Sequence, residues 1–347
     1  MTKMIDLRSD TLTLPSKEMM AFAFSAPVGD AGRMNDAKRS CDPSVTRLED
    51  YACHLTGKEA ALFLPSGTMG NHVALLTHCV PGSKVLLDRA QHSYRIEKAA
   101  FTPFWGQLIP VFYELTESGL PQTGSVKEGL QAGVDLLCVE NTHNGAGGVF
   151  LPKETLKTLR TLSKEAGVPI HMDGARLFNA AVASGMTAAE ICSYADSVMF
   201  CVSKGLGAPM GSLLCGSNRF IEKAAEQRKL LGGNLRQAGF MAAAGEFALH
   251  NNIERLKEDH RRTGELCRAM QDLPKIEVPS SVQSNMIIFN VSKTGLTSGE
   301  FITRLKKHGL WLSTSGNSCV RMLLYDGISD EDIQNAIQIL KEFLLSL

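Results

Sequence analysis

The chain has 347 residues, which exceeds the size at which one hydrophobic core usually stops growing, so a large domain and a smaller one are expected. Its hydrophobic content of 44% and charged content of 21% are ordinary for a globular protein. Lys and Arg (36) balance Asp and Glu (36), so the charge gives no electrostatic reason to expect nucleic acid or an anionic membrane as a partner.

The composition also bears on the compartment. The N-terminus shows no apolar stretch long enough for a signal peptide, and no segment approaches the roughly 20 apolar residues that span a bilayer. The nine cysteines are scattered singly, without a Cys-x-x-Cys pair, which favours reduced thiols over disulfides or a zinc site. We expect a cytoplasmic protein with no metal and no membrane partner.

From about residue 45 to 240 the pattern alternates helical periods with short apolar strands. Helix-like spacing over Val45–Gly57 is followed by an apolar strand at Ala60–Leu64, and a second clear helical period covers Lys153–Ala166. Further strands are expected at Lys84–Leu87, Gln107–Val111, Leu136–Val139, Val168–Met172, Val198–Val202 and Gly211–Leu214. Such alternation predicts an α/β fold with a mainly parallel, doubly wound sheet.

After about residue 245 the regular alternation of short strands and helices ends. A long charge-rich helix is expected over Phe247–Leu273, and shorter elements follow it. These are a strand at Met286–Val291, a helix at Ser298–His308, a strand at Ser318–Leu324 and a helix at Asp330–Leu345. We predict a large domain over 15–245 and a small α+β domain over 246–347, to which residues 1–14 contribute.

Two polar residues in the large domain follow apolar runs. Asp173 comes after the run 168–170, and Lys204 comes after the run 197–202, so both are expected at the carboxyl ends of strands, where α/β folds place their chemistry. A carboxylate that can hold a pyridinium proton and a lysine that can form a Schiff base are the two groups that pyridoxal phosphate most needs.

Other interpretations of these residues remain open at this point. Asp173 could cap a helix, and Lys204 could be an ordinary loop lysine. His171 and Asp173 lie on one face of a strand and could form part of a metal site, but no third ligand has a recognisable spacing.

Ser66, Gly67 and Thr68 follow a strand and precede a helix expected from Asn71. Glycine lets the backbone approach an anion, the first helical N–H groups point at it, and Thr68 adds a hydroxyl donor. An ordinary helix cap is an equally good interpretation of this turn alone. Together with Lys204 and Asp173, it is a candidate phosphate site.

The sequence resembles the low-specificity L-threonine aldolases, in the β-eliminating lyase group of the fold-type I pyridoxal phosphate enzymes. The segments that carry the resemblance are Ile5 to Thr11, Pro65 to Asn71, Glu140 to Asn144, His171 to Arg176, Ser203 to Pro209, Gly232 to Gly239, and Arg321. They run almost from end to end of the chain.

The resemblance implies a role for each matching position. It makes Lys204 the residue bonded to the cofactor, Asp173 the partner of the pyridine nitrogen, and His92 the imidazole stacked on the ring. The other cofactor-binding residues that it implies are Ser66, Gly67 and Thr68 at the phosphate, Arg176 near the ring hydroxyl, and Arg236 across a subunit interface. The substrate-binding residues that it implies are Ser9, His143, Arg176 and Arg321, and a guanidinium fork suits a carboxylate.

The activity implied is cleavage of L-threonine, L-allo-threonine or a related β-hydroxy-α-amino acid to glycine and an aldehyde. The base would be His92 or His143, directly or through water, and the protein would be a homodimer or homotetramer with active sites at the interface. Two alternatives stay open. One is a β-eliminating lyase that yields a keto acid and ammonia, and the other is a non-catalytic ligand-binding relative.

The stretch from Ala31 to Cys41 departs from the family pattern. It is several residues longer than usual, lacks the usual tyrosine and glutamate, and carries Arg33, Lys38 and Arg39. A lengthened surface loop would cost little stability. We nevertheless expect an effect on specificity, toward a larger or acidic β-hydroxy amino acid.

Overall fold

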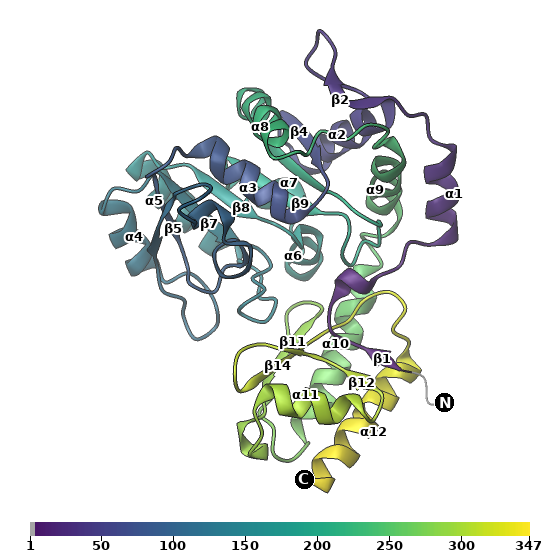
Figure 1. The fold of residues 1–347 in the computed structure, drawn as a ribbon. Helices are drawn as coiled ribbons and strands as arrows, with labels where there is room; N and C mark the ends of the chain where they lie inside the picture. The colour runs from purple at the N-terminus through teal and green to yellow at the C-terminus, as the bar shows by residue number, and fades with distance from the viewer. Residues whose placement is uncertain (1–3) are drawn as a thin grey trace.

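The computed structural model describes residues 4–347. A seven-stranded sheet forms the centre of the larger part of the molecule, above the smaller part in Figure 1. Its strands, in spatial order, are β4 (Ala60–Leu64), β10 (Ser212–Gly216), β9 (Ser197–Cys201), β8 (Ile170–Asp173), β7 (Leu136–Glu140), β5 (Lys84–Leu87) and β6 (Ile109–Phe112). Only β10 runs antiparallel to its neighbours. The predicted mainly parallel α/β sheet is confirmed.

Helices cover both faces of this sheet. One face packs the main apolar core against α2 (Pro43–Thr56), α4 (Thr123–Gln131), α5 (Lys153–Ala166), α6 (Leu177–Ser184), α7 (Ala188–Cys192) and α9 (Gly239–Asn251). The other face is covered by α3 (Gly67–His78) and α8 (Asn218–Leu230). Further helices of this part are α1 (Lys17–Ser25), which packs on α9, and the short η2 (Ser93–Glu97) and η3 (Ala99–Phe101).

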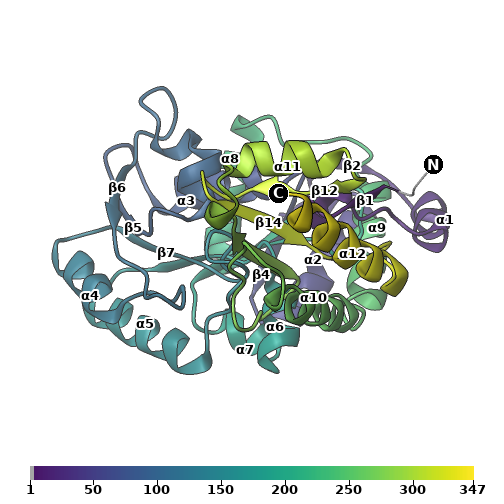
Figure 2. The same ribbon diagram turned by 90° about the horizontal axis from the view of Figure 1, so that it is seen from below.

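A second apolar core lies in the lower part of Figure 1. It is built from α10 (Leu256–Gln271), β11 (Met286–Asn290), η4 (Ser292–Thr294), α11 (Ser298–Lys306), β12 (Leu310–Trp311), β13 (Ser313–Thr314), β14 (Cys319–Leu323) and α12 (Asp330–Ser346). Strand β1 (Ile5–Asp6) pairs in parallel with β12 and buries Ile5 and Leu7 in the same core, and η1 (Asp10–Leu12) follows it. Figure 2 shows this pairing from below.

The expected long helix over Phe247–Leu273 is wrong, because the structure has two helices there. The first, α9, ends at Asn251, and α10 begins at Leu256. Asn252, in the break, uses its side chain to donate to the carbonyl of Leu206 at 2.7 Å. An asparagine side chain competes with helical hydrogen bonding, and here it serves the loop that follows Lys204.

The lengthened segment at residues 30–41 forms a hairpin. Strand β2 (Asp30–Met34) pairs antiparallel with β3 (Ser40–Cys41), with a register shift between Asp30 and Met34. The hairpin projects at the top of the molecule in Figure 1, near α2 and α8. Within the described residues, no helix is long and apolar enough to cross a membrane.

Candidate active site

The predicted chemical residues gather at the carboxyl edge of the central sheet. Asp173 ends β8, Lys204 lies three residues beyond β9, and His92 lies in the loop after β5. Because these strands are parallel, their carboxyl ends meet at the same edge. The positive charge of Lys204 lies near enough to favour the ionised form of Asp173 and also that of Asp10, in the N-terminal segment.

Asp173 is fully enclosed and held by two donors. Asn71 Nδ2 lies 2.8 Å from Asp173 Oδ2, and the backbone N–H of Ala175 donates to Oδ1 at 3.0 Å. Burial, together with the negative charges of Glu140 and Glu97, raises the pKa of Asp173 to about 6. A cation placed beside Asp173 would therefore be bound strongly by its ionised form.

The loop that carries Lys204 is held by the junction between α9 and α10. Arg255 donates to the carbonyl of Gly205 at 2.8 Å and is itself fixed by the buried Asp259, while Asn252 holds Leu206. Gly207 has φ +81°, a conformation that side chains rarely adopt. The helical periodicity of the sequence did not predict these contacts of Asn252 and Arg255, because they depend on the break between α9 and α10.

The first turn of α3 is the candidate phosphate site. Ser66 caps the helix by accepting from Met69 N at 3.2 Å, which leaves the first N–H groups of the helix, those of Gly67 and Thr68, for a ligand. A Cβ on Gly67 would lie 2.7 Å from Cys201 Sγ, so glycine is needed for the close approach of α3 to β9. The helix begins at Gly67, earlier than the expected Asn71.

Arg176 makes a buried ion pair that the sequence did not reveal. Its Nε and Nη2 donate to the two carboxylate oxygens of Asp10 at 2.7 and 2.8 Å, and Asn285 donates to the same carboxylate at 3.2 Å. Burial alone would raise the pKa of Asp10, but the charge and hydrogen bonds of Arg176 have the larger effect, so the pKa of Asp10 is lowered. Only the remaining edge of Arg176 is open to a cofactor or substrate.

Arg321, on β14, has a guanidinium that reaches the loop after β7 and is incompletely bonded. Its Nη1 donates to Asn144 Oδ1 at 2.9 Å, and its buried Nε has no partner within the described residues. Burial and the nearby charge of Arg176 lower the pKa of Arg321. Two guanidinium groups so close together attract an anion. Ser9, by contrast, uses its Oγ locally to accept from Thr11 at 2.8 and 3.2 Å.

The two candidate base residues differ in what their rings contact. His143 is buried, with Nε2 3.0 Å from Asp88 Oδ2 and Nδ1 accepting from Ala146 N at 3.1 Å, so both ring nitrogens are occupied. His92 has one recorded ring contact, between Nδ1 and Glu97 Oε1 at 3.1 Å, and its side chain is 33% exposed. Of the two rings, that of His92 has a nitrogen, Nε2, without a hydrogen-bond partner among residues 4–347.

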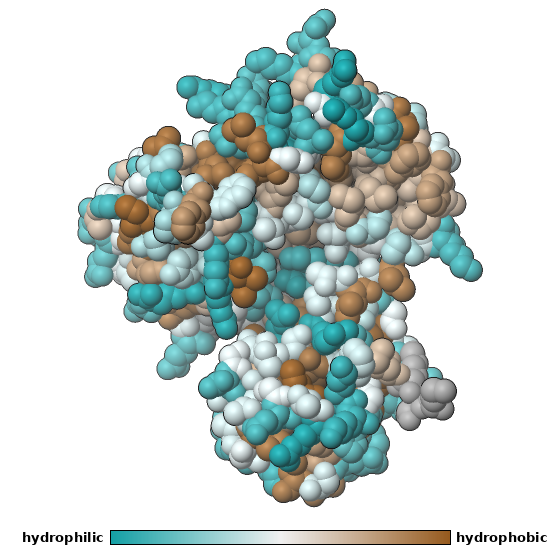
Figure 3. Space-filling model, viewed as in Figure 1, coloured by the Kyte–Doolittle hydropathy of each residue, from teal (hydrophilic) through white to brown (hydrophobic). Residues whose placement is uncertain are grey.

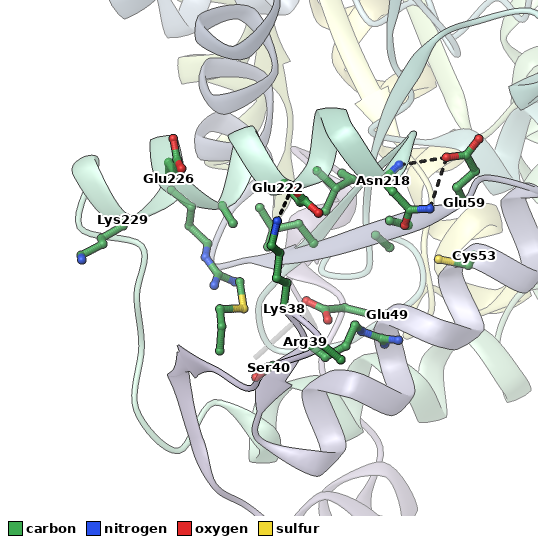
Figure 4. A pocket seen from close by; sticks show the side chains of 18 of the residues that line it. Lys38, Arg39, Ser40, Glu49, Cys53, Glu59, Asn218, Glu222, Glu226 and Lys229 are labelled. Atoms are coloured by element: carbon green, nitrogen blue, oxygen red, sulfur yellow. Dashed lines mark hydrogen bonds and ion pairs between the residues drawn. The ribbon is translucent and has the colours of Figure 1, made fainter.

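Arg236 and the cations of the hairpin form ion pairs with acidic side chains of this chain. Arg236 Nη1 contacts Asp30 Oδ1 at 3.1 Å, and Arg33 pairs with the same carboxylate. Lys38 bonds Glu222 of α8 and Arg39 bonds Asp50 of α2, each at 2.7 Å. Figure 4 shows Lys38 and Arg39 lining a cavity of about 520 Å³ between the hairpin, α2 and α8. None of these contacts includes Lys204.

A mainly parallel sheet with a lysine, an aspartate and a helix N-terminus at its carboxyl edge defines the fold-type I class. The sequence pattern of the β-eliminating lyase family matches residues 6–293. The chain therefore belongs to the β-eliminating lyase family.

Named relatives agree with this assignment. The low specificity L-threonine aldolase of Escherichia coli (strain K12) is 44% identical over 263 residues, covering 74% of this chain and 76% of that protein. Low-specificity L-threonine aldolase 1 of Arabidopsis thaliana is 34% identical over 354 aligned positions, covering 99% and 97%. The structure of Leishmania major threonine aldolase has the same fold, with a TM-score of 0.81 at 16% identity, covering 98% and 99% of the two chains.

Proposed function

We propose that the protein is a pyridoxal phosphate-dependent aldolase that cleaves L-threonine, L-allo-threonine or a related β-hydroxy-α-amino acid to glycine and an aldehyde. The observation that carries the proposal is the meeting of Lys204, Asp173 and the first turn of α3 at one sheet edge, with Arg321 near Arg176. The activities named for the Escherichia coli and Arabidopsis relatives support the same reaction.

The residues present fit pyridoxal phosphate in three respects. The N–H groups of Gly67 and Thr68 suit a phosphate, and Lys204 offers a primary amine. A protonated pyridine nitrogen would place a cation directly against Asp173, whose hydrogen-bond donors among the described residues are the Asn71 amide and the backbone N–H of Ala175. When bound, the cofactor supplies an aldehyde that condenses with an amino group and a ring that accepts the electron pair of the breaking bond.

Arg321 would bind the substrate carboxylate. Its buried Nε and remaining Nη group can donate two parallel hydrogen bonds, a geometry that matches a carboxylate and not a single acceptor atom. Arg176, fixed by Asp10, adds positive charge beside it. Binding at Arg321 fixes the amino acid by its invariant end, which leaves the side chain free to vary.

His92 would act as the base. Its free Nε2 can accept the proton of the substrate β-hydroxyl, directly or through one water, as the Cα–Cβ bond breaks and the aldehyde leaves. Return of a proton to Cα completes glycine. His143, whose ring nitrogens are both occupied, would instead hold the loop after β7 in place beside Asp88.

We also propose a homodimer or homotetramer with its active sites at the interface. Large apolar side chains are exposed on the chain, including Phe24 (71%), Phe104 (92%) and Trp105 (62%). Figure 3 shows apolar residues over α1, where Phe24 lies. A mostly apolar cavity of about 280 Å³ opens beside Ser66 and Thr68, which a second copy could cover. In such an assembly, Arg236 could reach the phosphate of another subunit.

The proposed location is the cytoplasm. All nine cysteines fall within the described residues, and each is a free thiol. Free thiols in that number suit a reducing compartment.

Product analysis tests the reaction directly. The purified protein is incubated with pyridoxal phosphate and a panel of β-hydroxy-α-amino acids, and glycine, aldehyde, keto acid and ammonia are measured. Equal amounts of glycine and aldehyde are expected. A keto acid with ammonia would show that the enzyme is a β-eliminating lyase, and no product at all would favour a ligand-binding relative.

Replacing Lys204 tests the attachment of the cofactor. Lys204→Ala is expected to abolish turnover and the absorbance of covalently held cofactor, with the unfolding curve little changed. Lys164→Ala, on the exposed face of α5, is the matched control and should keep both. A Lys204→Ala protein that still carried covalent cofactor would contradict the assignment.

A further inference from the structure

A buried carboxylate that sequence reasoning missed lies between His92 and Asp173. Glu97, at the end of η2, has a side chain that is only 3% exposed. Its Oε1 lies 3.1 Å from His92 Nδ1, and both of its oxygens lie 3.2 Å from Asn71 Nδ2. The same Nδ2 is 2.8 Å from Asp173 Oδ2. One amide group thus joins Glu97 to Asp173.

The orientation of the Asn71 amide follows from the groups on its other side. His171 Nε2 lies 3.4 Å from Asn71 Oδ1, and His171 Nδ1 lies 2.9 Å from Ser197 Oγ. Burial lowers the pKa of His171 to about 3, so this ring is neutral and carries one N–H. If that N–H is on Nε2, it donates to Asn71 Oδ1, and both amide hydrogens of Asn71 are left for Glu97 and Asp173.

The donors around Glu97 are therefore fixed by their own surroundings. Asn71 can only donate toward Glu97, and a carboxylate oxygen can only accept from His92 Nδ1. This leaves Nε2 as the exposed nitrogen of His92, the atom that the proposed reaction needs. A glutamine at position 97 would keep one acceptor oxygen within reach of both donors, but it would remove the negative charge that faces the His92 ring.

We propose that Glu97 is a positioning residue for this reaction, whose carboxylate fixes the tautomer and orientation of His92 and, through Asn71, the carboxylate of Asp173. The inference rests on the proposed function, because it assigns Glu97 a task at that same site. Glu97 touches neither substrate nor cofactor in this scheme. It acts through the two groups that do.

The charges that face His92 come from three elements. They are Glu97 on η2, Asp173 at the end of β8 and Glu140 at the end of β7. The hydrogen bond to Glu97 is the largest contribution, and together these groups raise the pKa of His92 above its ordinary value despite burial. Glu140 also accepts from the backbone N–H of His92 at 2.9 Å. Glu97 alone contacts the ring.

Glu97→Gln tests the proposal with a side chain of the same size and no charge. Without cofactor, the His92 ring should titrate about one pH unit or more below its position in the native protein, as measured by NMR with labelled histidine. With cofactor and substrate, the acid limb of kcat should move to lower pH in the same direction. At the pH optimum, kcat should fall by about tenfold to a hundredfold, with little change in KM.

Two further variants separate charge from packing. Glu97→Asp keeps the charge on a shorter side chain, so His92 should titrate nearer its native position than in Glu97→Gln. Glu117→Gln removes an exposed charge from the loop after β6 and should leave the His92 titration and the pH profile unchanged. If Glu97→Gln proves unstable, Glu97→Asp still tests the proposal, because the pKa of His92 in that variant should remain above the ordinary value of an imidazole.

The outcomes also distinguish this inference from the proposed function. An unchanged His92 titration in Glu97→Gln would overturn the positioning role, whatever the enzyme cleaves. A native protein that released no glycine would overturn the proposed function, while the titration without cofactor would still report on Glu97. Loss of kcat in Glu97→Gln with an unshifted pH profile would reduce Glu97 to a purely structural residue and would also overturn the proposal.

Discussion

Asp10 and Arg176 join the N-terminal segment to the start of α6 by two parallel hydrogen bonds of 2.7 and 2.8 Å, with both side chains buried. Asp10 follows β1, which packs in the second apolar core, whereas Arg176 precedes α6, which packs in the core against the central sheet. The pair therefore links elements of the two apolar cores beside the candidate site. It also limits which edge of Arg176 can meet a ligand.

Asp10→Asn should destabilise the fold strongly. The variant leaves a buried guanidinium without its counter-charge, which costs about 3–5 kcal/mol in comparable pairs. Asp6→Asn is the matched control, because its pair with Arg8 is partly exposed and is worth at most about 1 kcal/mol. Denaturant unfolding of both variants measures the difference, and equal losses would contradict the buried-pair argument.

The same pair makes stability depend on acid pH. Because Arg176 lowers the pKa of Asp10 in the folded protein, the stabilisation is complete above the unfolded pKa of about 3.9 and is lost as the pH falls through the folded value. The free energy of unfolding of the native protein should therefore fall more steeply below about pH 4 than that of Asp10→Asn.

Arg321→Lys should weaken substrate binding more than it slows the chemical step. Lysine keeps the charge but loses the planar fork, and hydrogen bonds to a charged group are worth about 1.5–3 kcal/mol, which corresponds to a rise in KM of about 10- to 150-fold. Arg304→Lys, on the exposed face of α11, should leave KM unchanged. A fall in kcat with an unaltered KM would show that Arg321 does not bind the carboxylate.

Substitutions of His92 and His143 should have different effects, the first on kcat and the second on stability. His92→Gln removes the free ring nitrogen, so kcat should fall by about 10²–10⁴-fold while stability changes little. His143→Ala leaves the buried Asp88 without its partner, which should cost about 1–3 kcal/mol of stability. Steady-state kinetics and denaturant unfolding of both variants decide the matter, and a reversed pattern would make His143 the base.

The strands of the central sheet and the residues at their ends were predictable because apolar runs are local signals. β4 and β5 have the bounds that the sequence predicted, and Asp173 and Lys204 fall at the expected sheet edge. Their partners were not predictable. Asn71 and Glu97 meet Asp173 only after α3 and η2 pack against the sheet, and no spacing in the sequence encodes that contact.

The break between α9 and α10 was missed for a related reason. Helical periodicity continues through it, although Asn251 and Asn252 are poor helix formers that could have indicated it. The hairpin at residues 30–41 was not predicted, because its residues carry neither a strong alternation nor a typical turn pair. Both features gain their structure from contacts with distant segments.

Asn252→Ala should loosen the loop that carries Lys204. The variant removes the donor to the carbonyl of Leu206, which should cost about 1–3 kcal/mol of stability and reduce the affinity for pyridoxal phosphate. Asn251→Ala is the control, since its side chain bonds only the exposed end of its own helix. Unfolding and cofactor titration should show the loss in the first variant alone. Equal cofactor affinity in the two variants would contradict a role for this junction.

The ion pairs of the hairpin cations argue against the effect on specificity that the sequence suggested, so neutralising these cations should leave the substrate preference unchanged. In Arg33→Gln, Lys38→Gln and Arg39→Gln combined, each lost pair is exposed, so stability should fall by at most about 1 kcal/mol per pair. These side chains pair with Asp30, Glu222 and Asp50 of the same chain, which leaves little free charge to attract an acidic substrate. The ratio of kcat/KM between β-hydroxy amino acids with acidic and neutral side chains measures the effect. A change in that ratio would show that the hairpin of one subunit acts at the site of another, because within one chain its cations contact only their own partners.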